Sequence, residues 1–297
     1  MSTPGVTLEQ FRHDLRTYAD LAEVEYDPAV MDPVLETLAD LWTTSVVGVR
    51  TTTHPVAERE LNVRMMHSSA PDLVPRLRKA GLLTYTGHPM EQLLTAVGDA
   101  VPVAWGVDVA VASGVQKIWT VFPELVPVTR MLEFPGMPDS ARAHAAHLDR
   151  YGGEIGIMAL DFASRTMNLY SKVFAPGELP PDEISRILAD LDFVPASEKE
   201  LRLLTGTFNL YRTFSWTSPR MRRICFPLRC DIDNFPTHLH PVLDRFVKGA
   251  PYSGPGRPKG LVFYVAYGPD DRYYKVQVGY TDAIGATYPG GTVPQMK

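Results

Sequence analysis

Five segments of this chain alternate apolar side chains with polar ones, and a cation recurs at the polar positions. Because successive side chains of a strand point to opposite faces, each segment predicts a β-strand that is apolar on one face and charged on the other. Each is the returning strand of a hairpin, and the hairpin centres fall roughly every 50–57 residues, a period typical of repeat architectures. The five segments are residues 60–65, 117–122, 166–172, 223–226 and 273–278.

Helix-like sequence separates the hairpins, so that helices and strand pairs alternate along the chain. In residues 32–42, for example, Asp32 is the predicted N-cap and Pro33 the first helical residue. The predicted helices are residues 7–21, 32–42, 71–80, 89–98, 123–132, 139–151, 181–191, 197–204 and 235–249. The predicted strand pairs are residues 44–53 with 59–67, 101–110 with 115–122, 155–162 with 165–174, 207–216 with 220–228, and 260–267 with 272–281.

Ten antiparallel strands in five hairpins can form an open sheet or a closed barrel. A closed barrel removes both exposed edges, and ten strands leave a wider lumen than eight do. The apolar faces would then pack against helices while the polar faces line the lumen. We therefore expect an α+β protein, a ten-stranded antiparallel β-barrel of five ααββ repeats whose polar lumen is surrounded by an outer ring of α-helices. We expect a single domain over residues 1–297, with flexible termini at residues 1–6 and 283–297.

Composition excludes several classes of function. The net charge of −5 argues against a nucleic-acid binder, which usually shows a basic balance or basic patches. Cys225 and Cys230 provide neither a disulfide framework nor a CxxC metal pair, and His238 and His240 diverge at the start of a predicted helix, so no metal site is expected. We find no long apolar stretch and no signal-peptide pattern. We expect a cytoplasmic protein that does not associate with a membrane.

The recurring cations predict a binding site for an anion. Any one of them could lie on a solvated strand face, but all come from different hairpins and share one facing. Cations and neutral donors around one point suit a phosphate or diphosphate, because charge-assisted hydrogen bonds are the stronger kind. No glycine-rich phosphate loop offers an alternative site. The predicted diphosphate-binding residues are Arg64, Lys117, Asn168, Lys172, Tyr211, Arg223 and Lys275.

Aromatic side chains accompany these cations. Trp119, Tyr170, Phe208 and Tyr211 lie near them in the sequence, and Trp119 and Tyr170 are on the strand face that holds the cations. One interpretation is ordinary core packing. The other is a stack that sandwiches a flat substrate or shields a carbocation through the ring quadrupole.

Several short motifs together resemble one family in their order and spacing. They are residues 79–89 (KAGLLTYTGHP), 117–119, 167–170, 208–211 with Arg223 downstream, and 273–275. The chain resembles the soluble aromatic prenyltransferases with the ααββ repeat, the ABBA or PT-barrel enzymes of bacterial aromatic natural-product pathways. The resemblance extends from about Thr7 to Tyr280 and includes nearly the whole chain.

The resemblance implies roles for individual residues. In this family basic and tyrosyl residues in the lumen hold a diphosphate, and Lys117, Tyr211, Arg223 and Lys275 match them as the catalytic set, with Asn168 beside them. Magnesium-dependent members have an aspartate at the position of Asn62. Because an amide is a poor ligand for Mg²⁺, we expect Arg64 to neutralise charge in its place and no cofactor to be required.

Some members have a lysine where this chain has Ser164, and Lys172 is expected to compensate for it. The facing of the strands and the resemblance together predict an aromatic and prenyl pocket, in which Gln277 orients a hydroxyl of the acceptor. Gly279 leaves space on the same face of its strand. The predicted pocket residues are Val49, Asn62, Trp119, Tyr170, Phe208, Asn209, Cys225, Val262 and Gln277.

The expected activity is transfer of a dimethylallyl or geranyl group from its diphosphate to an electron-rich hydroxylated aromatic, such as a naphthalene or phenol, by Friedel-Crafts-type substitution. We expect the enzyme to be a monomer whose partners are the allylic diphosphate and the small aromatic acceptor. The rival hypothesis is a non-catalytic carrier that holds a small aromatic or an isoprenoid phosphate in the lumen. A carrier has little use for several cations that converge on one leaving group.

Overall fold

The computed structural model describes residues 7–42, 44–175, 177–252 and 260–281. Ten antiparallel strands of this described chain form a closed barrel in the order β1-β10-β9-β8-β7-β6-β5-β4-β3-β2. Each strand pairs with its neighbours in the sequence, and the pairing of β1 with β10 closes the ring. The fold predicted from the sequence is confirmed. The termini predicted to be flexible, residues 1–6 and 283–297, lie outside the described residues.

The strands belong to five consecutive hairpins, as the alternation of side chains predicted. Their bounds are Val46–Thr52 (β1), Leu61–His67 (β2), Ala104–Ala110 (β3), Gly114–Pro127 (β4), Glu154–Asp161 (β5), Thr166–Ser171 (β6), Tyr211–Ser215 (β7), Arg223–Cys230 (β8), Leu261–Tyr267 (β9) and Arg272–Gly279 (β10).

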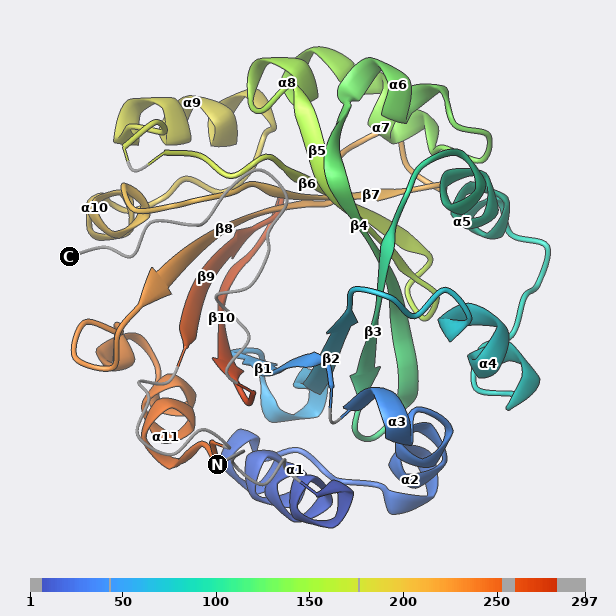
Figure 1. Ribbon diagram of the computed structural model, residues 1–297. Helices are drawn as coiled ribbons and strands as arrows, with labels where there is room; N and C mark the ends of the chain where they lie inside the picture. Colours follow the sequence, from blue (N-terminus) through green and yellow to red (C-terminus); the bar gives the residue numbers. More distant parts are fainter. Residues whose placement is uncertain (1–6, 43, 176, 253–259, 282–297) are drawn as a thin grey trace.

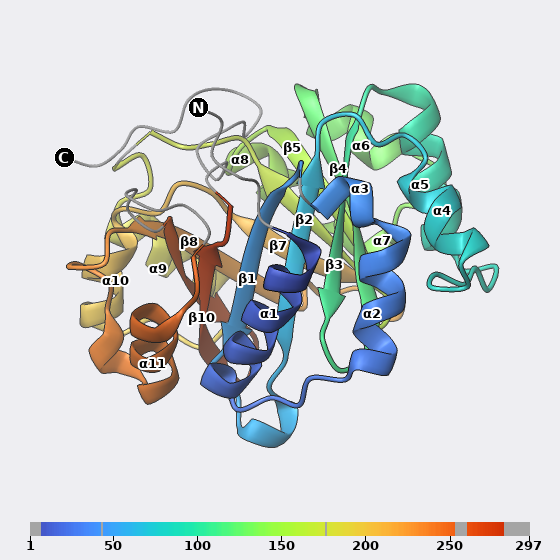
Figure 2. The ribbon, with the colours of Figure 1, turned by 60° about the horizontal axis from the view of Figure 1, so that its bottom comes forward.

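Helices surround the barrel on its outside (Figure 1). The side view shows α1 and α2 lying along the outer face of β1, β2 and β3 (Figure 2). The helices of the described chain are Leu8–Ala22 (α1), Pro28–Thr37 (α2), Ala39–Trp42 (α3), Leu73–Lys79 (α4), Pro89–Ala100 (α5), Val128–Glu133 (α6), Asp139–Ala143 (α7), Ala145–Arg150 (α8), Pro181–Asp190 (α9), Glu198–Leu204 (α10) and Pro241–Gly249 (α11).

Three helix starts differ from the sequence prediction, each for a local reason. The helix predicted for residues 235–249 begins only at Pro241 (α11), where the His240 ring accepts a hydrogen bond of 3.2 Å from the Val242 amide. Helix α2 begins one turn earlier than predicted, because the Asp27 side chain caps the Ala29 amide at 2.8 Å and Pro28 takes the first helical position. The same pair of signals at Asp32 and Pro33 lies inside the helix. Helix α6 begins only at Val128, because β4 resumes its pairing with β5 after a bulge and continues to that point.

The two faces of the barrel wall have different surroundings. Outward side chains such as Val63, Val107 and Ile118 belong to the main apolar core beneath the helices. Inward side chains such as Trp119 and Tyr264 belong to a second, smaller cluster inside the barrel. The space that these inward side chains surround is called the lumen below. Among the described residues, no helix combines the length and the apolar character needed to cross a membrane.

Candidate active site

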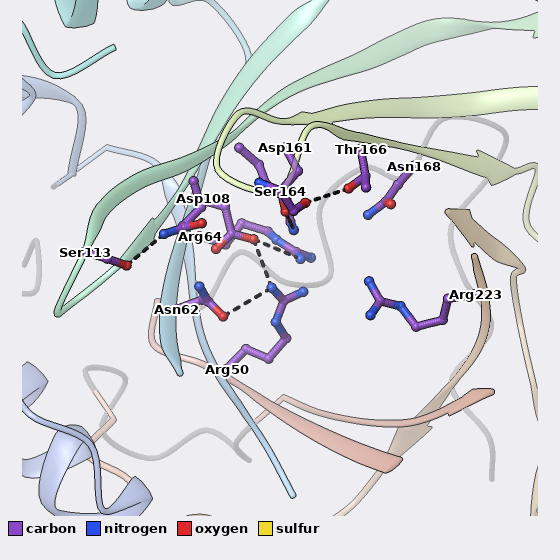
Figure 3. Close-up of polar contacts among 12 residues, drawn as sticks. Arg50, Asn62, Arg64, Asp108, Ser113, Asp161, Ser164, Thr166, Asn168 and Arg223 are labelled. Atoms are coloured by element: carbon purple, nitrogen blue, oxygen red, sulfur yellow. Dashed lines mark hydrogen bonds and ion pairs between the residues drawn. The ribbon is translucent and has the colours of Figure 1, made fainter. Parts of the chain in front are cut away.

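Two arginines share one buried carboxylate inside the barrel. The register places Arg50 of β1 opposite Asn62 of β2, and Arg64 of β2 opposite Asp108 of β3. Asp108 has no exposed surface, and its Oδ2 lies 3.1 Å from Arg50 Nη2 and 3.5 Å from Arg64 Nη2. The second Asp108 oxygen, Oδ1, has no hydrogen-bond partner within the described residues. Figure 3 shows both guanidinium groups meeting at this carboxylate.

A second ion pair continues the ring of charge along the barrel wall. Lys117 of β4 lies opposite Asp108 on one side and Asp161 of β5 on the other, and its Nζ forms an ion pair with Asp161 Oδ2. The Ser164 amide donates to Asp161 Oδ1 at 2.8 Å. Burial alone would raise the pKa of Asp161, but Lys117 and the hydrogen bonds lower it, so the carboxylate stays ionised.

Two further cations come from β8 and from β10, the strand that pairs with β1. Arg223 of β8 and Lys275 of β10 lie on either side of β9, and the Arg223 guanidinium points toward the charged residues of β1, β2 and β3 (Figure 3). Arg223 Nη1 donates a hydrogen bond of 2.7 Å to Tyr273 Oη. Lys275 Nζ lies 5.3 Å from the centre of the Tyr273 ring.

Burial and the repulsion between the cations of the lumen both lower the pKa of Lys275. Burial, followed by repulsion from Arg223, Arg50 and Lys117, holds the pKa of this lysine well below 10.5, although the Cys225 thiol acts in the opposite direction. The five cations Arg50, Arg64, Lys117, Arg223 and Lys275, together with the two carboxylates Asp108 and Asp161, give this part of the lumen a net charge of about +3 when every group is ionised. Such an excess of positive charge in a buried site favours an anionic ligand.

A row of aromatic rings crosses the lumen beside this charge. Ring centres are 5.1 Å apart for Trp119 and Tyr170, 4.1 Å for Tyr170 and Tyr211, and 5.8 Å for Tyr211 and Tyr264. The Arg64 guanidinium carbon lies 3.9 Å from the centre of the Trp119 ring, so cations and rings are in direct contact. These faces can stabilise a positive charge near the anion site.

Gln277 and Gly48 lie together on neighbouring strands. Gln277 Oε1 accepts a hydrogen bond of 3.1 Å from Tyr264 Oη. A Cβ atom at Gly48 would lie only 3.0 Å from Gln277 Nε2. The absence of a side chain at Gly48 therefore provides the space in which the Gln277 amide lies. Gln277 therefore adjoins the aromatic row, where sequence reasoning placed it.

The comparison with protein families agrees with this geometry. The family model described as "Aromatic prenyltransferase Orf2" matches residues 6–287. The chain belongs to this aromatic prenyltransferase family. The protein is therefore an enzyme that transfers prenyl groups. The resemblance inferred from the short motifs is confirmed.

Three curated prenyltransferases are similar over most of their length. Flaviolin linalyltransferase of Streptomyces virginiae is 28% identical over 269 residues, 87% of this chain and 89% of that protein. The furaquinocin biosynthesis prenyltransferase of Streptomyces sp. (strain KO-3988) is also 28% identical, over 88% of this chain and 86% of its own. The 5,10-dihydrophenazine-1-carboxylate 9-dimethylallyltransferase of Streptomyces anulatus is 27% identical, over 82% and 84%.

Most predicted site residues of this prenyltransferase do face the lumen. Trp119, Tyr170, Phe208, Tyr211, Cys225 and Val262 belong to the inner cluster. Asn168 is buried, and its Nδ2 donates to Tyr170 Oη at 3.3 Å. Burial raises the pKa of the Cys225 thiol although Lys275 and Arg223 oppose this, so the thiol keeps its proton.

Three predicted residues have other surroundings. Val49 belongs to the outer core under the helices, because Arg50 takes the inward position of β1; its assignment to the prenyl pocket is therefore wrong. The Asn209 amide bonds the Ser171 carbonyl at 2.9 Å and hydroxyl at 3.0 Å, and so ties β6 to the start of β7. Lys172 follows the end of β6 and lines a hollow of about 340 Å³ that also contains Glu178 and Glu183.

Sequence reasoning missed four polar residues of the lumen. Three of them, Arg50, Asp108 and Asp161, lie on the first strand of a hairpin, and Asp161 is the last residue of its strand. The cations predicted from the sequence all came from returning strands. The strand alternation that revealed Arg64 would also have revealed Arg50 and Asp108. Tyr273 was part of a recognised motif, but no role was assigned to it.

Proposed function

We propose that this enzyme transfers a dimethylallyl or geranyl group from its diphosphate to an electron-rich hydroxylated aromatic. The observation that carries this proposal is the excess of cations in the lumen beside a row of aromatic rings. The relatives support it, because their names describe transfer of linalyl or dimethylallyl groups, to flaviolin in one case and to a dihydrophenazine carboxylate in another.

The cations stabilise the departure of diphosphate. Lys117, Arg223 and Lys275 bind its oxygens from different walls of the barrel, with Asn168 and Tyr211 as neutral donors. As the bond between C1 of the prenyl group and oxygen breaks, its electron pair moves to the diphosphate. Donors that are already in place stabilise this developing negative charge best, because they need no reorganisation.

The row of aromatic rings stabilises the allylic cation that remains when diphosphate leaves. Trp119, Tyr170 and Tyr211 present ring faces to the allylic cation and shield it from water. A ring carbon of the acceptor then attacks C1, a carbon–carbon bond forms, and the loss of a proton from that ring carbon restores aromaticity. Gln277 orients an acceptor hydroxyl through the amide atom that Tyr264 does not occupy.

Arg64, together with Arg50, neutralises charge where magnesium-dependent members of the family use a metal. Asn62 has no charge and accepts from Arg50 at 3.5 Å, and Asp108 already lies against two guanidinium groups. Mg²⁺ prefers carboxylate and water oxygens in octahedral geometry, and two arginines beside them repel it. These residues do not fit a magnesium site, and we propose a metal-independent reaction.

The rival function, a non-catalytic carrier, is disfavoured by membership of an enzyme family. We further propose that the chain forms one domain, is a monomer and acts in the cytoplasm. The negative net charge of −5 supports the absence of a nucleic-acid partner.

The experiment is incubation with dimethylallyl or geranyl diphosphate and a panel of hydroxylated naphthalenes and phenols, followed by chromatography. We expect a prenylated product, and we expect Lys117→Ala or Arg223→Ala to lower kcat by about 10²- to 10³-fold. Lys248→Ala, an exposed lysine of α11, is the matched control and should leave kcat unchanged. Unchanged kcat/KM in both lumen variants would refute the diphosphate site.

A further inference from the structure

Tyr273 is a lumen residue that the proposed reaction does not yet use. It lies on β10 opposite Ala266 of β9, is 8% exposed, and belongs to the inner cluster that also contains Tyr211 and Cys225. Lys275, two residues later on the same strand, shares its facing. The tyrosine therefore lies within the predicted diphosphate site.

Tyr273 contacts both cations of this wall. Arg223 Nη1 donates to its hydroxyl at 2.7 Å, and Lys275 Nζ lies 5.3 Å from its ring centre. The His54 ring packs against the tyrosine, with ring centres 3.9 Å apart. The ring is thus held in place, and it in turn holds the Arg223 guanidinium, which comes from a strand two positions away in the barrel.

The Tyr273 hydroxyl has a hydrogen left to donate. Burial raises the pKa of this phenol even though Arg223 opposes the shift, so the hydroxyl keeps its proton at neutral pH. A hydroxyl can accept and also donate. Tyr273 accepts from Arg223, and no acceptor for its own hydrogen is found among the residues that the structure describes. The charged groups in contact with it, Arg223 and Lys275, are donors when protonated.

We propose that Tyr273 donates a hydrogen bond to the substrate's diphosphate and is the positioning residue for Arg223. This inference rests on the proposed function, because it requires a diphosphate in the lumen. An anionic oxygen between Arg223 and Lys275 accepts from both cations and from the phenol, while the phenol oxygen continues to accept from Arg223. One hydroxyl then fixes the direction of the guanidinium and adds a neutral donor of its own.

The test compares Tyr273→Phe with Tyr274→Phe. The first removes the lumen hydroxyl and keeps the ring against His54. The second removes a hydroxyl that donates to Glu200 Oε1 at 2.9 Å on the outer face of the same strand. Titration calorimetry with inorganic diphosphate measures Kd, and steady-state assays with the allylic diphosphate measure kcat and KM.

We expect Tyr273→Phe to weaken diphosphate binding by about 10- to 100-fold and to lower kcat, as loss of a hydrogen bond to a charged group does. Tyr274→Phe should preserve both. In Tyr273→Phe/Arg223→Gln, the loss should be smaller than the product of the two single losses, because the residues act through one contact. A merely structural tyrosine would not show this coupling.

The outcomes separate this inference from the function on which it rests. If the unmodified enzyme does not bind diphosphate, both are overturned. If it binds diphosphate and Tyr273→Phe binds equally well with the same kcat, the role of Tyr273 is overturned and the proposed function stands. Equal losses in Tyr273→Phe and Tyr274→Phe would also overturn it, since they would indicate a general effect on β10.

Discussion

Diphosphate binding should draw a proton onto Lys275. In the empty lumen this lysine is surrounded by Arg223, Arg50 and Lys117, and burial with their repulsion keeps its pKa well below 10.5. A diphosphate brings negative charge to the same place, which favours the ammonium form and raises the pKa again. Between these two pKa values the free enzyme holds a neutral amine and the complex holds a cation.

The sign and size of the effect follow from linkage. The complex binds one proton more than the free enzyme in this window, so affinity for diphosphate falls as pH rises, by up to about tenfold in Kd per pH unit, or about 1.4 kcal/mol. The unfolded chain, with an ordinary lysine, also binds a proton that the empty native state lacks. Lys275 therefore lowers the free energy of unfolding of the empty protein as pH falls through the range between the two pKa values. Bound diphosphate removes this destabilisation.

The assay is calorimetric titration with inorganic diphosphate in two buffers of different ionisation enthalpy, because the difference in heat gives the number of protons exchanged. Lys275→Arg is the control: its guanidinium stays charged throughout, so only the ligand's own proton exchange remains. Lys248→Arg, at an exposed lysine, should behave like the unmodified enzyme. The reasoning is refuted if the unmodified enzyme and Lys275→Arg exchange the same number of protons.

Three further predictions concern the metal, the acceptor and the buried carboxylate. Turnover should survive excess EDTA, because Arg64 and Arg50 neutralise charge without a metal; loss of activity that magnesium restores would contradict this. Gln277→Ala should raise the acceptor KM or alter the product ratio, measured by chromatography, and should leave the Kd of the allylic diphosphate nearly unchanged. An unchanged product ratio with unchanged acceptor kinetics would show that Gln277 does not belong to the site. Asp108→Asn should lower the free energy of unfolding by about 3–5 kcal/mol, measured by urea denaturation, because it leaves Arg50 and the buried Arg64 without their carboxylate. Wild-type stability would show that the arginines find other compensation.

The sequence prediction failed at Val49 and at the start of α2 for different reasons. Val49 was assigned to the pocket although the alternation of β1 directs it outward and Arg50 inward. Asp32 and Pro33 look like a helix start, but Asp27 and Pro28 provide the same signals one turn earlier and nucleate α2 there. The first error came from the facing assigned within one strand, and the second from two start signals of the same kind that lie within a few residues of each other.

The alternation of side chains along the chain was enough to predict the ten strands, their arrangement in hairpins and the strand face on which Arg64, Lys117 and Lys275 lie. This was possible because alternation along a strand is a local property of the backbone. Which side chains meet in the lumen depends on how distant strands pair. The pairing of β1 with β10 brings Arg50 opposite Gln277 from the far end of the chain, and the approach of β8 to β10 joins Arg223 to Tyr273. Such contacts depend on register and closure between distant segments, which no local pattern specifies.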